Sequence, residues 1–295
     1  MMMLDELRDL IDRHARPDAS TPIEGLQLAR SETFHDEPSM SGTVFALIAQ
    51  GAKHIALGDR VYDYGVGQYL VASVDMPISG HFVETEPGKP VLGIGLILHP
   101  ATIAELLLQA PAGALPTTGA VPPSGMAVSE APPELLEALL RLARLLDRPH
   151  DLPVLEPLIK REILWRLIVG EQGATVRQLG LADSSLSHIA RAVRWIREHY
   201  ASAFKVEDVA QISGMSPSAF YRNFQAVTAM SPIQFQKQIR LQEARLMLAT
   251  RPGDVTGIGY SVGYESPSQF SREYRRLFGA PPSQDAQRLS RMALV

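Results

Sequence analysis

Two short stretches near the C-terminal end carry side chains able to bind DNA bases and phosphates. They begin at Ser216 and Ser266, fifty residues apart, and Ser, Pro, Ser, Phe and Arg fall on the same offsets in both. Arginine donates to phosphate oxygens and to guanine, while serine and glutamine form hydrogen bonds with base edges. A pattern that occurs twice at a fixed spacing is a stronger signal than one copy. The repeat therefore predicts two nucleic-acid contact sites.

Each stretch has the start signal of a helix, because a serine can act as N-cap and the next residue, proline, as the first helical residue. A short apolar helix that ends at a glycine precedes each one, over 206–214 and 255–263. A helix, a glycine turn and a capped helix form a helix-turn-helix. The sequence thus predicts two helix-turn-helix motifs.

Period 3.6 separates an inner from an outer face in each capped helix. Phe220 and Phe224 lie four residues apart, as do Phe270 and Tyr274, so each pair packs inward. The alternative for the outer faces is an ordinary solvated surface. The predicted DNA-binding residues are Ser218, Ala219, Tyr221, Arg222, Gln225, Ser268, Gln269, Ser271, Arg272, Arg275 and Arg276.

The charge of the chain is distributed unevenly. The formal net charge is −4, yet residues 188–295 carry fourteen Lys and Arg against eight Asp and Glu, which leaves a charge of −10 on the remainder. A positive domain suits a polyanionic partner. The asymmetry assigns DNA binding to the C-terminal part and a different role to the N-terminal part.

The stretch from Gly263 to Pro282 resembles the C-terminal signature of the AraC-type (AraC/XylS) transcriptional regulators, and the resemblance covers about residues 187–289. It implies a DNA-binding domain with two helix-turn-helix motifs. One departure is Gly259, where the family usually has alanine. Gly257 and Gly259 each weaken their helix by roughly 1 kcal/mol relative to alanine. We therefore expect the second motif to be looser than the first.

The N-terminal part contains short β-rich runs separated by turn residues. Runs at 43–49, 53–57, 60–64, 69–74 and 91–98 read as strands, and Gly58-Asp59 is a hairpin turn signal. Five or more such strands suggest a small β-barrel or sandwich. The family resemblance implies a cupin-like β-barrel that senses a small-molecule effector, and the stretch 51–71 resembles one N-terminal subgroup.

Polar and aromatic residues of this part form a candidate effector site. A cupin metal site would need two histidines close together on one strand, and the chain has no His-x-His, so we expect no metal and no cofactor. A satisfied core or rim position is the alternative for each candidate. The predicted effector-binding residues are His54, Tyr62, Tyr64, Tyr69, Asp75 and His81.

Two leucine-rich helices follow a short helix at 101–109 and a long loop at 110–133. The helices at 134–146 and 153–169 carry more apolar residues than one packing face requires. One interpretation is a stripe that binds a second copy of the chain, as the resemblance implies. The alternative is that both stripes are internal core.

The domain boundaries follow from these segments. We predict an effector-sensing and dimerisation domain at 1–170, a linker at 171–187 and the DNA-binding domain at 188–295. In the last, a helix at 188–200 turns Ile189, Val193 and Ile196 inward. A second helix at 231–249, capped by Ser231, joins the two motifs. Its length, about 26 Å, suits two recognition helices near the roughly 34 Å separation of successive major grooves.

Composition excludes several classes of protein. No apolar run is long enough to cross a membrane, and the charged N-terminal helix is unlike a secretory signal. The absence of cysteine excludes disulfide scaffolds, thiolate zinc sites and cysteine nucleophiles. No Gly-x-Ser-x-Gly, phosphate-loop or His-Glu-x-x-His motif is present. These features favour a cytoplasmic protein that is not an enzyme.

The predicted fold is α+β: an N-terminal cupin-like β-barrel followed by helices, and an all-α C-terminal domain with two helix-turn-helix motifs. The leading hypothesis is a sequence-specific transcriptional regulator that responds to a small-molecule effector. Expected partners are operator or promoter DNA, the effector and a second copy of the chain, with RNA polymerase as a further candidate. The alternatives are a cupin-type metalloenzyme fused to a DNA-binding tail and an architectural DNA binder without an effector.

Overall fold

The computed structural model describes residues 2–32, 37–83, 88–111, 113–116 and 125–292. The chain forms two compact units. The N-terminal unit comprises residues 1–190 and 226–229, and the C-terminal unit comprises residues 191–225 and 230–295. The division falls inside helix α6 (Ser185–Glu198) and inside helix α8 (Pro217–Thr228).

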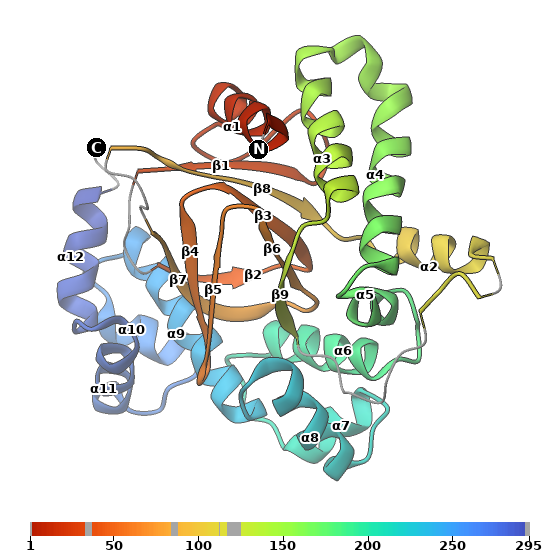
Figure 1. Ribbon diagram of the computed structural model, residues 1–295. Helices are drawn as coiled ribbons and strands as arrows, with labels where there is room; N and C mark the ends of the chain where they lie inside the picture. The colour runs from red at the N-terminus through yellow and green to blue at the C-terminus, as the bar shows by residue number, and fades with distance from the viewer. Residues whose placement is uncertain (1, 33–36, 84–87, 112, 117–124, 293–295) are drawn as a thin grey trace. The chain divides into compact units, whose positions relative to one another are not determined.

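Two antiparallel sheets form the centre of the N-terminal unit. The five-stranded sheet has the order β1 (Leu26–Ser31), β8 (Val91–Ile97), β3 (Val44–Gln50), β6 (Gln68–Ala72) and β9 (Met126–Glu130). The four-stranded sheet has the order β2 (Glu37–Ser41), β7 (Met76–Val83), β4 (Ala52–Leu57) and β5 (Arg60–Gly65). The sheets form a sandwich-like pair, so the expected closed barrel is corrected to two separate sheets (Figure 1).

Most of the predicted strands are confirmed. Strands β3, β4, β5, β6 and β8 occupy the expected runs, and the Gly58-Asp59 turn joins β4 to β5. Strand β7 was not expected, because Pro77 and Gly80 resemble turn residues. Gly80 is needed in that strand, since a Cβ there would lie 2.5 Å from the carbonyl oxygen of His54 on β4. Strand β9 lies within the predicted loop.

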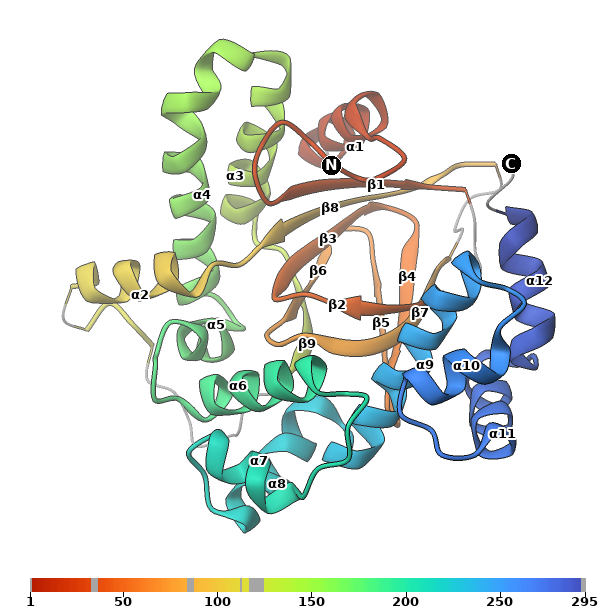
Figure 2. The ribbon, with the colours of Figure 1, turned by 180° about the vertical axis from the view of Figure 1, so that it is seen from behind.

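The helices of the N-terminal unit cover the outer face of the five-stranded sheet. The three that do so are α1 (Met2–His14), α3 (Pro133–Arg144) and α4 (Leu152–Val169) (Figure 1). Figure 2 shows α2 (Pro100–Gln109) and α5 (Gly173–Leu179) beside the C-terminal end of α4. Helix α5 falls in the predicted linker, and its Val176 is fully buried in the core that these helices share with the sheet.

The leucine-rich helices divide into buried and exposed parts. In α3, Leu135, Leu139 and Leu142 are fully buried, so the apolar side chains of this helix pack in the internal core. Exposed apolar residues are found at the start of α4 instead, where Val154 is 66% and Leu158 60% exposed. The surplus apolar surface predicted from the sequence thus lies on α4.

The C-terminal unit is helical and contains both predicted helix-turn-helix motifs. The first consists of α7 (Val206–Ile212) and α8, and the second of α10 (Val255–Ser261) and α11 (Pro267–Phe278). Helix α9 (Pro232–Thr250) joins them, and α12 (Pro282–Met292) follows. The turn of the first motif is formed by residues 213–216, whereas that of the second, 262–266, is one residue longer.

Capping and aromatic packing in these helices agree with the sequence prediction. The side chain of Ser266 accepts a hydrogen bond from the backbone N–H of Gln269, and Ser231 forms a capping box with Gln234 at the start of α9. Phe220 and Phe224 are fully buried, and so are their counterparts Phe270 and Tyr274.

Steric constraints explain why α10 contains two glycines, and these constraints cannot be read from the sequence. A Cβ at Gly257 would lie 2.4 Å from the carboxylate of Asp254, which is the N-cap of this helix. A Cβ at Gly259 would lie 3.0 Å from Cδ1 of the buried Phe270. Both glycines therefore permit contacts that stabilise the second motif, which offsets their low helix propensity.

We expect Gly259→Ala to lower the free energy of unfolding by roughly 1 kcal/mol, because crowding a packed aromatic ring costs more than the gain in helix propensity. Thermal unfolding of the full chain measures the change. Gly253→Ala is the matched control, since its Cβ would meet open space. An increase in the midpoint for Gly259→Ala would contradict the steric argument.

Candidate nucleic-acid interface and ligand cavity

The second helices of the two motifs, α8 and α11, carry the predicted DNA-binding residues. Each helix buries its aromatic pair, so its remaining face points outward. Eight of the eleven predicted residues are exposed, and Ala219, Gln269 and Ser271 are half-buried. The sequence therefore placed the surface of these helices correctly.

Four arginines on this surface have no ion-pair partner among the residues that the structure describes. They are Arg222 on α8 and Arg272, Arg275 and Arg276 on α11. A guanidinium without an internal carboxylate partner can donate to phosphate oxygens or to a guanine edge.

Other arginines of the C-terminal unit have structural roles. Arg240 donates to the backbone carbonyl oxygens of Tyr200 and Gly263, at 2.7 and 2.8 Å, and so ties α9 to the turn of the second motif. Arg245 donates to the fully buried carboxylate of Asp285 at 2.9 Å. Arg240 and Arg245 therefore donate their hydrogen bonds to groups within the C-terminal unit, whereas the outer arginines of α8 and α11 have no such ion-pair partner among the described residues.

A cavity of about 340 Å³ lies between the two sheets of the N-terminal unit. The five-stranded sheet contributes small residues to its wall, among them Ala46, Ala72, Gly93 and Gly95. The four-stranded sheet contributes larger side chains, including Ile55, Ile78 and Phe82. The wall is thus mainly apolar, as is usual for sites that bind small organic molecules.

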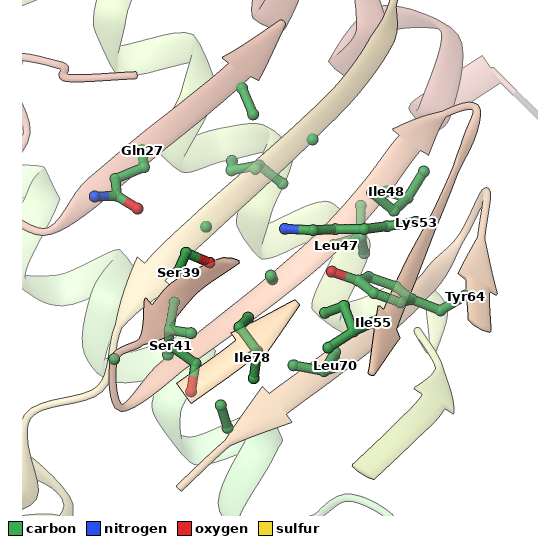
Figure 3. A pocket seen from close by; sticks show the side chains of 18 of the residues that line it. Gln27, Ser39, Ser41, Leu47, Ile48, Lys53, Ile55, Tyr64, Leu70 and Ile78 are labelled. Carbon is green, nitrogen blue, oxygen red and sulfur yellow. The ribbon is translucent and has the colours of Figure 1, made fainter. Parts of the chain in front are cut away.

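Lys53 is the one charged side chain among the described residues that line the cavity. Figure 3 shows its ammonium group and the hydroxyl group of Tyr64 pointing into the cavity from neighbouring strands. The Lys53 Nζ atom lies 4.8 Å from the centre of the Phe82 ring. Burial lowers the pKa of Lys53, because the apolar surroundings destabilise the charged form.

The predicted effector-binding residues do not form one site. Tyr64 lines the cavity. Tyr69 points to the opposite face of its sheet, where it is buried against Phe45 with ring centres 5.3 Å apart. Tyr62 and Asp75 are half-buried outside the cavity wall.

The two histidines lie on the outer face of the four-stranded sheet. His54 and His81 stack with ring centres 5.0 Å apart, and the Nδ1 atom of His54 lies 2.6 Å from a carboxylate oxygen of Asp63. Their neighbours Lys53 and Phe82 face the cavity, so alternation along the strands turns both histidines away from it.

Sequence reasoning missed Lys53, although a signal was present. Lys53, Ile55 and Leu57 alternate along β4, so a lysine shares its face with two apolar residues. Gly93 and Gly95 lie two residues apart in the predicted strand at 91–98. Their period of two predicts one strand face without side chains, which is the face that leaves room for the cavity.

A second hollow, of about 530 Å³, lies beside α2 and α5 and is lined by Leu107, Leu108, Leu181 and Arg177. The Arg177 guanidinium donates to the carbonyl oxygens of Ile168 and Pro116, so its hydrogen bonds serve the fold. The cavity between the sheets is therefore the better candidate for a ligand site.

No cluster of three or more His, Asp or Glu side chains has an arrangement that could hold a metal ion within the described ranges. None of the helices in those ranges is both long and apolar enough to cross a membrane.

Comparison with known proteins agrees with the two-part organisation. The family model described as the N-terminus of AraC-type transcriptional regulators matches residues 22–175, more than half of the chain, and a helix-turn-helix domain model matches residues 209–288. The chain belongs to the family of AraC-type transcriptional regulators.

Individual relatives share part of the chain. The HTH-type transcriptional regulator ExsA of Pseudomonas aeruginosa is 28% identical over 166 residues, which are 56% of this chain and 59% of ExsA. The virulence regulon transcriptional activator VirF of Yersinia enterocolitica is 28% identical over 167 residues, 55% of this chain and 59% of VirF. The chain thus spans about three fifths of the length of these relatives.

The fold of the whole chain is similar to that of ToxT from Vibrio cholerae. A structure of apo ToxT superposes with a TM-score of 0.55 at 10% identity, covering 90% of this chain and 98% of ToxT. ToxT bound to (E)-4-(8-methylnaphthalen-1-yl)but-3-enoic acid gives a TM-score of 0.55 at 9% identity and covers 90% of this chain and all of ToxT. At this identity the similarity establishes the fold alone.

Proposed function

We propose that the protein is a sequence-specific DNA-binding transcriptional regulator that works in the cytoplasm. The observation that carries the proposal is the pair of outward-facing helices, α8 and α11, with four arginines free of ion pairs among the described residues. Both motifs lie in a region that matches a helix-turn-helix model in an AraC-type chain. Nothing in these features favours the fused metalloenzyme.

The four arginines form two pairs according to their position along α8 and α11. Arg222 and Arg272 lie at the same offset in α8 and α11, near the middle of each outer face, where a side chain can reach a base edge. Arg275 and Arg276 lie in the last turn of α11. We assign the first pair to base contacts and the second pair to phosphate contacts, which position the protein without reading sequence.

We also propose that the cavity between the sheets holds the effector, and that the effector is a small apolar molecule with one carboxylate. Lys53 is a half-buried cation without an anionic partner in the described part of the chain, so a carboxylate would supply the missing counter-charge. The apolar wall would take the rest of the molecule. ToxT, which shares the fold, has been crystallised with such a carboxylic acid.

The exposed apolar residues of α4 support a third element of the function. Val154 and Leu158 lie four residues apart and face outward, and Leu155 beside them is 39% exposed. Such a patch on a folded unit suits a protein–protein contact. We propose that a second copy of the chain covers it in a homodimer.

Arg222→Ala and Arg272→Ala should each weaken binding to the preferred DNA by roughly 1–3 kcal/mol, because each removes a contact with a base. The preferred duplex is first selected from a randomised pool with the full chain, and its affinity is then measured by titration. Arg194→Ala, which removes an exposed arginine of α6, is the matched control and should change binding to all sequences alike. Unchanged affinity in both variants would place the DNA elsewhere.

Apolar monocarboxylates should raise the thermal midpoint of the full chain, whereas their methyl esters should not. The affinity should be highest where the acid is ionised and Lys53 is still protonated, and it should fall as pH rises above the lowered pKa of Lys53 or drops below the pKa of the carboxylic acid, since binding requires both charges. A screen of aromatic and straight-chain acids by thermal shift, repeated across pH, measures this. Lys53→Met should abolish the difference between acid and ester, and equal stabilisation by both would contradict the proposal.

Leu158→Glu should convert the proposed dimer into a monomer, because it places a charge in an apolar contact. Sedimentation of the full chain at micromolar concentration measures the mass. Leu108→Glu is the control, since Leu108 is 88% exposed on α2. A parent chain that sediments as a monomer would remove the α4 patch as a dimer contact.

A further inference from the structure

We propose that Glu273 is a specificity-positioning residue that fixes the side-chain amide of Gln269, so that the second helix-turn-helix selects adenine or cytosine at one position of its DNA site. The proposal rests on the proposed function and concerns how one motif reads sequence. Both residues lie on α11, four residues apart, so their side chains are neighbours on one face of the helix.

The Glu273 carboxylate is held from three directions. Its Oε1 atom accepts from Lys237 Nζ of α9 at 2.9 Å and from Gln269 Nε2 at 3.2 Å. Its Oε2 atom accepts from the Tyr264 hydroxyl group at 2.8 Å. The carboxylate therefore links the joining helix, the turn and the recognition helix, and its position is fixed by parts of the fold outside α11.

Glu273 is an acceptor in this arrangement. Its side chain is only 15% exposed. Burial acts to raise its pKa, but the hydrogen bonds from Lys237, Tyr264 and Gln269 outweigh burial and hold the pKa below its usual value. An ionised carboxylate has no proton to donate. It can therefore bind only the NH₂ end of the Gln269 amide.

The orientation of Gln269 follows from this contact. Its Nε2 atom is bound to Glu273, so the carbonyl oxygen Oε1 is turned away from the carboxylate and is available to an outside donor. In an isolated glutamine either end of the amide could face outward. Glu273 removes that choice and makes the outward group of Gln269 an acceptor.

The major groove of DNA offers few donors to such an acceptor. Adenine presents its N6 amino group and cytosine its N4 amino group, whereas guanine and thymine present acceptors. A fixed carbonyl oxygen thus attracts an amino base and repels the other two. With its second N–H, Gln269 can also donate to N7 of adenine, which favours adenine over cytosine.

The first motif lacks this pair of a glutamine amide and a carboxylate that orients it. The positions that correspond to Gln269 and Glu273 in the repeat are Ala219 and Asn223. In the turn, Met215 takes the place of Tyr264, since the N–H groups of both donate to the carbonyl oxygen five residues earlier, and Met215 has no hydroxyl group. The amino-base preference is therefore expected once per chain and in the half of the site that the second motif contacts.

The test is selection of binding sites from a pool of randomised DNA duplexes, with the full-length parent and three variants. In the parent motif, one position should favour adenine or cytosine over guanine and thymine by about tenfold or more. Glu273→Gln gives residue 273 a donor that can turn the amide of Gln269, so the preference at that position should fall to within about threefold while other positions keep theirs. Gln269→Met should remove the same preference.

The controls separate base reading from folding and from charge. Glu265→Gln removes a carboxylate from the exposed surface of the same turn and should leave the motif unchanged. Each variant is also tested for thermal unfolding and for affinity to random DNA, which a loss of the amide contact alone should not alter. Should Glu273→Gln fail to fold, Gln269→Met still decides, because it leaves the bonds from Lys237 and Tyr264 to Glu273 in place.

The outcomes are distinguishable. A motif retained at every position in Glu273→Gln or in Gln269→Met overturns the inference, and so does a parent preference for guanine or thymine at the affected position. A parent chain that selects no motif overturns the proposed function itself. Loss of the amino-base preference in both variants, at the same position, supports the inference.

Discussion

The N-terminal unit depends on the alternation of side chains in its five-stranded sheet. On β8, Leu92 and Leu96 are buried in the core that the sheet shares with the helices, whereas Gly93 and Gly95 line the cavity. On β6, Tyr69 and Val71 lie in that core, whereas Leu70 and Ala72 line the cavity. Because the side-chain period of a strand is two, a shift of one residue in the pairing would exchange the two faces. Core packing and cavity volume are therefore specified together by one strand register.

The C-terminal unit depends instead on polar groups placed inside a small helical core. The buried Asp285 accepts from Arg245 of α9 and from the hydroxyl group of Tyr274 on α11, at 2.9 and 2.8 Å. Burial, together with the nearby carboxylate, raises the pKa of Tyr274, so the phenol keeps its proton and remains a donor. Loss of one member of such a buried ion pair costs several kcal/mol, about 3–5. The packing of α9, α11 and α12 thus holds the second recognition helix in place.

The sequence predicted the elements with strong local signals. The serine caps, the Ser231 capping box and the inward aromatic pairs are local features, and each was found as expected. Strand β9 was missed because it pairs with β6, more than fifty residues earlier in the chain, and its own sequence contains no turn or hairpin signal.

The candidate sites differ in how far the sequence could define them. The outer faces of α8 and α11 follow from helical period alone. The cavity does not, because it depends on which sheet face each strand turns inward. Tyr69 was expected in the effector site and packs on the helix side instead. The role of Gly259 was hidden for a similar reason, since the sequence does not show the distance to Phe270.

The chemical difference between the two motifs has a consequence for how a chain would lie on DNA. The second motif has Tyr264, Gln269 and Glu273 where the first has Met215, Ala219 and Asn223, so the two motifs offer different groups to the bases. A duplex read by two unlike motifs has a left and a right end, because a reversed chain would meet the wrong bases at both. A single bound chain would then mark one strand direction and would point consistently upstream or downstream along a promoter.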